Sequence, residues 1–165
     1  MFIERVCRKL SECNVPYAIV GGHAAALHGA VRGTIDIDLV IVWTAKNPKT
    51  AKLALKELGL VSSLPITAEE VFANRESYIT NSNLIAWNFH NPESFNEQVY
   101  LIINYDLDQR NRKLIRPGDY TISILAIADL IAMKRESGRP QDLADVEALE
   151  KSANEGVAAV YRPIT

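Results

Sequence analysis

The sequence predicts a mixed α/β (α+β) domain in which helices cover one face of a small mixed β-sheet. Short apolar runs typical of strands alternate with segments of helical periodicity, and Gly, Pro and Asn separate them. The strands follow one another mostly in chain order, with helices before and between them, which favours this class. At 165 residues the chain is long enough to bury a core, so we expect a single domain over residues 1–165.

The first half of the chain is expected to alternate helices and strands. Helical spacing of apolar residues starts the chain, and the run YAIV that follows Pro16 is typical of a short strand. The apolar run around DID predicts a second, longer strand, and Gly59 fits the end of the next helix. The predicted elements are a helix over 2–13, a strand over 17–20, a helix over 23–28, a strand over about 35–43 and a helix through LALKEL up to Gly59.

The second half is expected to hold three strands followed by two helices. Thr67 with Glu70 resembles a capping box that opens a short helix. In the last helix, Leu143, Val146 and Leu149 are predicted to share one face. The other predictions are strands over 82–89, 98–103 and 120–124, a loop over 106–113, and helices over 125–136 and 142–152.

The bulk composition is that of a soluble globular protein. Apolar residues make up 48% of the chain and charged residues 23%, and the net charge of −2 provides no general attraction for nucleic acid. Cys7 and Cys13 lie six residues apart in one predicted helix, on different faces, so we expect reduced thiols and a cytoplasmic protein. We find no signal peptide and no apolar run long enough for a membrane span, and we expect no membrane partner.

The most informative feature is a pair of aspartates that follows a pair of glycines. Asp36 and Asp38 belong to the run TIDIDLVIV, and residues two apart in a strand point to the same face. Two neighbouring carboxylates repel each other, so a cation is expected between them, and Mg²⁺ prefers such oxygen ligands. Taken alone, the DID motif is more typical of a strand end that meets solvent or lysines.

The glycine pair strengthens the metal interpretation. Gly21 and Gly22 end the first predicted strand and precede an alanine-rich helix. A strand, a glycine turn and a helix together point backbone N–H groups at an anion. A phosphate-binding turn beside two carboxylates predicts a site for a nucleotide and a metal ion.

These motifs resemble the nucleotidyltransferase fold of the polymerase-beta superfamily. The match covers roughly residues 15–43 and 120–150, where Lys134, Gly138, Arg139, Asp142 and Asp145 form the second block. The chain is most similar to small bacterial members, namely the minimal nucleotidyltransferases and the nucleotidyltransferase-like toxins of abortive-infection systems. The resemblance implies metal-dependent transfer of a nucleoside monophosphate from an NTP to a hydroxyl of RNA or protein, with Mg²⁺ or Mn²⁺ as cofactor.

The resemblance also implies roles for particular residues. Asp36 and Asp38 would be the catalytic metal ligands. Arg139 and Asp142 are equally well explained as a pair that caps the last helix. His23 can also be an exposed residue at a helix start, and Arg32 can be a simple partner of Asp36. The implied nucleotide-binding residues are Gly21, Gly22, His23, Arg32, Thr34 and Lys134.

The sequence departs from the family pattern at one position. Active members carry a third carboxylate on a later strand, and Tyr100 stands at that place here. A phenol with a pKa near ~10 is a poor Mg²⁺ ligand at neutral pH. Glu97, Asp106 and Asp108 are the candidate replacements.

Three functions therefore stay open. The chain is an active nucleotidyltransferase, a degenerate relative that binds a nucleotide or a partner protein without catalysis, or a structural domain that uses the fold alone. The resemblance to toxins adds the partner protein of a toxin–antitoxin pair to the expected partners.

Overall fold

A computed structural model describes residues 1–31 and 33–155 of the chain. Its strands form one seven-stranded sheet in the order β3-β4-β5-β2-β1-β7-β6. The strands are β1 (Tyr17–Val20), β2 (Ile37–Ile41), β3 (Val61–Ser62), β4 (Ala86–Asn91), β5 (Ser94–Ile102), β6 (Arg112–Ile115) and β7 (Ile122–Leu125). The helices are α1 (Phe2–Glu12), α2 (Gly21–Leu27), α3 (Asn47–Glu57), α4 (Ala68–Ala73), α5 (Arg75–Asn81), α6 (Ile127–Ser137) and α7 (Pro140–Glu155).

The middle of the sheet is built from the segments that carry the sequence motifs. Strand β2 pairs antiparallel with β1 and parallel with β5, so the sheet is mixed, as predicted. Strand β1 also pairs in parallel with β7, at Ile19 and Ile124. All four residues of β1 and all four of β7 are buried, which places the core around these two strands.

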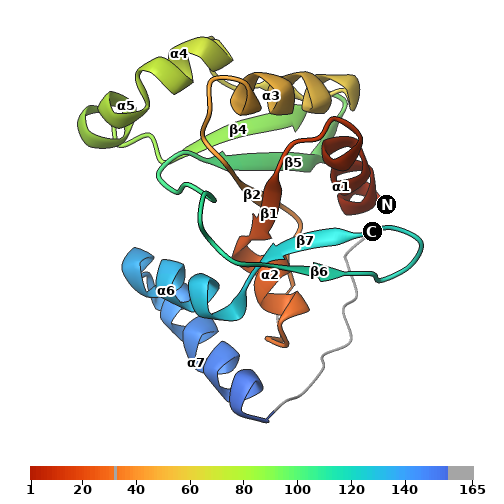
Figure 1. Cartoon of the computed structure of the whole chain (residues 1–165), viewed down its shortest axis with the longest axis vertical. Helices are drawn as coiled ribbons and strands as arrows, with labels where there is room; N and C mark the ends of the chain where they lie inside the picture. The colour runs from red at the N-terminus through yellow and green to blue at the C-terminus, as the bar shows by residue number, and fades with distance from the viewer. Residues whose placement is uncertain (32, 156–165) are drawn as a thin grey trace.

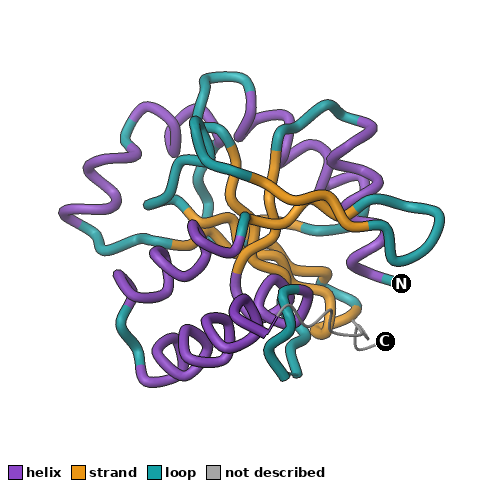
Figure 2. The backbone as a smooth tube through the Cα atoms, turned by 60° about the horizontal axis from the view of Figure 1, so that its bottom comes forward, coloured by secondary structure: helices purple, strands orange, loops and turns teal. Residues whose placement is uncertain are grey.

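Helices α1 and α3 lie against one face of the sheet, the face that carries Glu97 and Trp87. Arg5 of α1 bonds Glu97 of β5, and Lys52 of α3 lies over the ring of Trp87 in β4. Helices α6 and α7 gather at the other end of the molecule, near α2 (Figure 1). Figure 2 shows the strands crossing the centre of the molecule with the helices around them.

The structure corrects several element boundaries. Strands β3 and β6 and helix α5 were not predicted, and β6 occupies the end of the predicted loop over 106–113. Both strands are short, and β6 has three exposed residues out of four, so neither carries an apolar pattern. Leu143 is 50% exposed and does not share the buried face of Val146 and Leu149.

No helix in the described part of the chain has the length and apolar character needed to cross a membrane.

Candidate functional site

The carboxylate of Asp38 lies directly against the backbone of Gly21. Asp38 pairs with Val20 across β2 and β1, so the residue after Val20 passes beside its side chain. A Cβ atom on Gly21 would stand 2.9 Å from the Asp38 Cγ, and closer still to Oδ2. Gly21 also has a φ of +66°, a conformation that costs other residues free energy. The group that lies against the Gly21 backbone is the Asp38 carboxylate, and the nucleotide contact predicted for Gly21 stays a prediction.

Asp36 lies outside the strand that was predicted to contain it. Strand β2 begins at Ile37, and Asp36 is an exposed residue in the bend before it. Thr34 Oγ1 donates to the Asp36 backbone oxygen at 3.4 Å, inside the same bend. Burial is the main cause that raises the pKa of Tyr100, and the negative charges of Asp36 and Asp38 raise it further. Both aspartates are therefore close to Tyr100.

Helix α2 begins at Gly21 itself, two residues earlier than predicted, and holds Gly22 and His23 in its first turn. The His23 side chain is 3% exposed, so the expectation of an exposed residue at the helix start is wrong. Burial lowers the pKa of His23, while its hydrogen bond to the Ile35 backbone and the charge of Asp36 oppose that shift. His23 therefore ties the segment that carries Asp36 to the first turn of α2.

Tyr100 stands beside Asp38 on the neighbouring strand. The parallel pairing of β2 and β5 places Asp38 opposite Tyr100. This is the place where the family resemblance implied a third carboxylate. Burial and the two nearby aspartates raise the pKa of Tyr100, so its phenol is neutral and protonated at pH 7.

Two of the three candidate replacements, Glu97 and Asp106, do not reach this place. Glu97 is an odd number of residues from Tyr100 on β5, so it points to the other face, where it bonds Arg5 and Asn91. Asp106 Oδ1 accepts from the backbone N–H of Trp43 at 3.1 Å and of Asp108 at 3.0 Å, in the loop beyond β5.

The C-terminal block forms a cluster of charges between α6 and α7. Lys134 Nζ donates to Asp145 Oδ2 at 2.8 Å and lies 4.0 Å from Asp142 Oδ1. Its side chain is 6% exposed, so its amino group faces these carboxylates and not solvent. The structure contains the ion pair between Lys134 and Asp145. The nucleotide contact that the resemblance implies for Lys134 stays a prediction.

Arg139 connects this cluster to the aspartate pair. Its Nε donates to Asp142 Oδ2 at 2.7 Å and its Nη2 to Oδ1 at 3.3 Å, which is the pairing that the sequence analysis considered. That hydrogen bonding is the main cause that raises the pKa of the guanidinium, and the charge of Asp38 adds to it. The start of α7 is therefore electrostatically coupled to the end of β2 that holds Asp38. Arg32, also predicted to bind the nucleotide, lies outside the described residues.

The donor set at the aspartate pair fits one divalent cation that shares its ligands with a substrate. Mg²⁺ is commonly held by one or two carboxylates together with phosphate oxygens and water. Asp36 and Asp38 offer two carboxylates of this kind. No three His, Cys, Asp or Glu side chains in residues 1–31 and 33–155 form a complete metal site, so the remaining ligands would have to come from the substrate.

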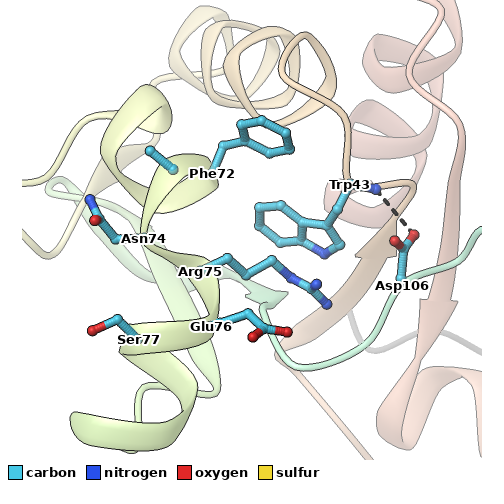
Figure 3. Close-up of a pocket in the computed structure, with 8 residues that line it drawn as sticks. Trp43, Phe72, Asn74, Arg75, Glu76, Ser77 and Asp106 are labelled. Atoms are coloured by element: carbon cyan, nitrogen blue, oxygen red, sulfur yellow. Dashed lines mark hydrogen bonds between the residues drawn. The ribbon is translucent and has the colours of Figure 1, made fainter.

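A cavity of ≈410 Å³ lies at the opposite end of β2. Trp43, Phe72 and Arg75 form part of its wall, and the Arg75 guanidinium lies 5.1 Å from the Trp43 ring centroid (Figure 3). Trp43 follows β2 whereas Asp38 is near its start, so this cavity is separate from the aspartate pair.

The polar residues on β4 and β5 that lie beside Tyr100 were not predicted as part of the site. Asn88 is the partner of Tyr100 on β4, and His90 is the partner of Gln98. The alternation of apolar and polar residues in AWNFH was the available signal, since it gives Trp87 and Phe89 one face and Asn88 and His90 the other.

Comparison with known proteins supports the fold through structure and not through sequence. No family model matches the chain. No curated protein sequence matches it either. The antibiotic-resistance factor ANT(2'')-Ia aligns with a TM-score of 0.58 and 14% identity, over 95% of this chain and 83% of its own.

Two further solved structures agree. A nucleotidyltransferase-like protein of Paracoccidioides brasiliensis aligns with a TM-score of 0.55 and 21% identity, over 89% of this chain and 73% of its own. The lincosamide antibiotic adenylyltransferase LnuA aligns with a TM-score of 0.55 and 14% identity, over 87% of this chain and 90% of its own. The chain has a nucleotidyltransferase fold, as its glycine and aspartate motifs predicted.

Proposed function

We propose that this chain binds a nucleoside triphosphate with Mg²⁺ or Mn²⁺ at Asp36 and Asp38, and transfers the nucleoside monophosphate to a hydroxyl group. The observation that carries this proposal is the contact between the Asp38 carboxylate and the Gly21 backbone. It joins the carboxylate pair to the strand–glycine–helix junction, and a nucleotide with its metal ion needs both. The fold shared with known nucleotidyltransferases supports the same conclusion.

The residues of the site have distinct tasks in this proposal. Asp36 and Asp38 would hold the ion, which neutralises charge on the phosphates and on the attacking and leaving oxygens. The absence of a side chain at Gly21 lets the Asp38 carboxylate lie against the strand–glycine–helix junction, where the triphosphate would bind. Because His23 bonds the Ile35 backbone, it would keep Asp36 in position.

The transfer itself is a displacement at the α-phosphorus. The acceptor hydroxyl oxygen forms a bond to the α-phosphorus, the bond from that phosphorus to the bridging oxygen of the β-phosphate breaks, and pyrophosphate leaves. Tyr100 is protonated at neutral pH and does not serve as the base, so the hydroxyl proton passes to solvent water.

The acceptor was predicted to be RNA or protein, with a toxin–antitoxin partner as a further expectation. The structural neighbours add a third class, because ANT(2'')-Ia has been solved with adenylyl-2''-tobramycin and LnuA with lincomycin. All three classes present a hydroxyl group.

A second candidate function is nucleotide binding without transfer. The observation that favours it is Tyr100 in register with Asp38, where a third carboxylate would complete the metal site. A protein of this kind would keep metal-dependent affinity for NTP and would act as a nucleotide-binding or protein-interaction module.

Metal-dependent nucleotide binding tests the shared part of both candidates. We expect isothermal titration calorimetry with each of the four NTPs to show binding with Mg²⁺ and little binding with EDTA. The variant with both Asp36→Asn and Asp38→Asn should lose the Mg²⁺-dependent binding, because it keeps the shape of the site and removes its charge. Unchanged binding in that double variant would contradict the site.

The choice between the two candidates depends on turnover. Release of pyrophosphate from the bound NTP in the presence of an acceptor supports transfer, while tight binding without pyrophosphate release supports the binding module. Asp106→Asn is the matched control, because this aspartate accepts backbone hydrogen bonds near Trp43, away from the site.

A further inference from the structure

Five polar side chains extend from the aspartate pair across the neighbouring strands. Tyr100 lies opposite Asp38, and Asn88 lies opposite Tyr100 on β4. One step along the same face, Gln98 lies opposite His90. We call this group the polar row; it consists of Ser63, Asn88, His90, Gln98 and Tyr100.

The polar row occupies the less covered face of β4 and β5. Trp87 and Phe89 of β4, like Val99 and Leu101 of β5, are fully buried on the opposite face. The four strand residues of the polar row are half-buried, and Ser63 at the edge is exposed. This half of the face is therefore accessible beside the aspartate pair.

Hydrogen bonds fix the side chains of the polar row to one another. Asn88 Nδ2 donates to Gln98 Oε1 at 3.1 Å, and the Tyr100 hydroxyl lies 3.4 Å from the same oxygen. Ser63 Oγ donates to Asn88 Oδ1 and lies 3.0 Å from His90 Nδ1. The row is thus a pre-organised surface on rigid strands, with amide, phenol, imidazole and hydroxyl groups that suit a ligand rich in hydroxyls.

The dimensions of the polar row suit a small molecule. Neighbouring strands are about 4.8 Å apart, so Asn88 lies roughly 10 Å from Asp38 across β5. A ligand of one or two sugar-sized rings can therefore bond Asn88 and Gln98 while it presents a hydroxyl at the aspartate pair.

The charge of this face argues against RNA as its ligand. The polar row contains no lysine or arginine, whereas binding of nucleic acid depends on cations that neutralise phosphates. The lysines of α3 do not supply such cations, because Lys52 packs over Trp87 on the opposite face and Lys49 pairs with Glu69. Arg139, whose charge acts on Asp38, is already bonded to Asp142.

We infer that the polar row is the acceptor-binding surface, and that its ligand is a small sugar-like molecule rich in hydroxyls and without phosphate. This inference rests on the proposed function, because it assigns the acceptor of the same site. Asn88 and Gln98 set the specificity by bonding hydroxyls of the acceptor. Tyr100 fills the place next to Asp38 and bounds the space in which the reacting hydroxyl lies.

The side-chain amides of Asn88 and Gln98 can report binding directly. Their NH₂ signals appear in ¹H–¹⁵N spectra of the full chain and can be assigned from the spectra of Asn88→Ala and Gln98→Ala. With Mg²⁺ and ATP present, we titrate trehalose, lincomycin, tobramycin and a single-stranded RNA oligonucleotide. We expect these two signals to shift with at least one of the three small molecules and not with the RNA.

Transfer from ATP labelled at the α-phosphate gives the second readout. We expect the label to be transferred to a small molecule that shifts the NH₂ signals of Asn88 and Gln98. The Asn88→Ala substitution should raise the KM for this small molecule about fivefold to tenfold, as expected for one or two lost hydrogen bonds. The Kd for ATP should not change. Asn91→Ala is the matched control on the same strand, since Asn91 bonds Glu97 instead of the polar row. Thermal melts exclude unfolding of either variant.

The outcomes separate this inference from the proposed function. If ATP with Mg²⁺ does not bind, the proposed function fails, and the inference fails with it. If ATP binds but only RNA is labelled, or none of the small molecules moves the Asn88 and Gln98 signals, the inference alone is overturned.

Discussion

At the scale of single residues, the site depends on one contact between a glycine and a carboxylate. Gly21 has a left-handed φ of +66°, and its missing side chain leaves the space that the Asp38 carboxylate fills. Gly21 directly follows β1, and Asp38 lies on the adjacent antiparallel strand β2, so the contact follows from the pairing of Val20 with Asp38. Any side chain at Gly21 would displace the proposed metal ligand.

Gly21→Ala should therefore weaken nucleotide binding much more than its effect on stability explains. The positive φ alone costs an alanine about 1–2 kcal/mol of folding free energy. The clash with Asp38 should add about a 10- to 100-fold loss of affinity for Mg²⁺-NTP, the range expected when the support of a metal ligand is lost. Calorimetric titration and urea unfolding measure the two effects.

Gly59→Ala provides the matched control for this variant. Gly59 has a φ of +86°, and an added Cβ would meet no atom within 4 Å. The Gly59→Ala variant should therefore lose stability because of the positive φ and should keep full nucleotide affinity. Equal affinities of the two variants would contradict the role of Gly21.

At the scale of elements, the charged cluster between α6 and α7 holds this helical pair together. Gly138, with a left-handed φ of 66°, ends α6, and Pro140 begins α7 two residues later. The turn brings Lys134 against Asp142 and Asp145 in a buried environment. Because Asp142 also binds Arg139, the same cluster sets the position of the positive charge that acts on Asp38.

Lys134→Met should destabilise the chain strongly. Removing the amino group breaks the buried ion pair with Asp145, while Asp142 keeps its pairing with Arg139. Breaking a buried ion pair in this way costs about 3–5 kcal/mol. Urea unfolding followed by circular dichroism measures the loss. A change below about 1 kcal/mol would show that the cluster contributes little to stability.

Arg135→Met is the control in the same helix. Arg135 pairs with Glu150 of α7, and both side chains are about half exposed. Loss of an exposed pair should change the free energy of unfolding by less than about 1 kcal/mol.

At the scale of the whole molecule, the half-buried His28 connects three parts of the chain. His28 follows α2, its ring nitrogen Nε2 lies 2.7 Å from the Leu125 oxygen of β7, and its backbone oxygen accepts from Ser152 of α7. Burial is the main cause that lowers the pKa of His28, and its bond to Leu125 opposes the shift. Burial therefore opposes protonation of a ring that lies where α2, β7 and α7 meet.

Stability should fall as the pH drops below about 6.5, the pKa of histidine in an unfolded chain. With a lower pKa in the folded state, the unfolded state binds more protons between the two values, so the stabilisation is present above this window and lost within it. Free energies of unfolding between pH 5.5 and 7.5 measure the slope.

His28→Gln tests which residue causes this slope. Glutamine keeps an N–H donor for the Leu125 oxygen but does not titrate, so the slope should become flatter than in the unchanged chain. An identical slope in both proteins would show that His28 does not contribute.

The sequence was most informative where a local pattern fixes local structure. The glycine pair after a short apolar strand and the DID run indicated the fold, and the mixed sheet and the fold are both confirmed. Strand and helix boundaries were less accurate where a segment is short and exposed, as in β6, because such strands depend on pairing and not on an apolar pattern.

The sequence by itself determined the two motifs, the types of residue at the site and the missing third carboxylate. Only the tertiary structure decided what lies around them: Asp36 precedes β2, Tyr100 and Asn88 line up with Asp38, and Lys134 is buried against Asp145. These facts depend on the register between strands far apart in the chain and on the packing of α6 against α7. A shift of one residue in that register would turn Tyr100 to the other face, and no local pattern in the sequence fixes it.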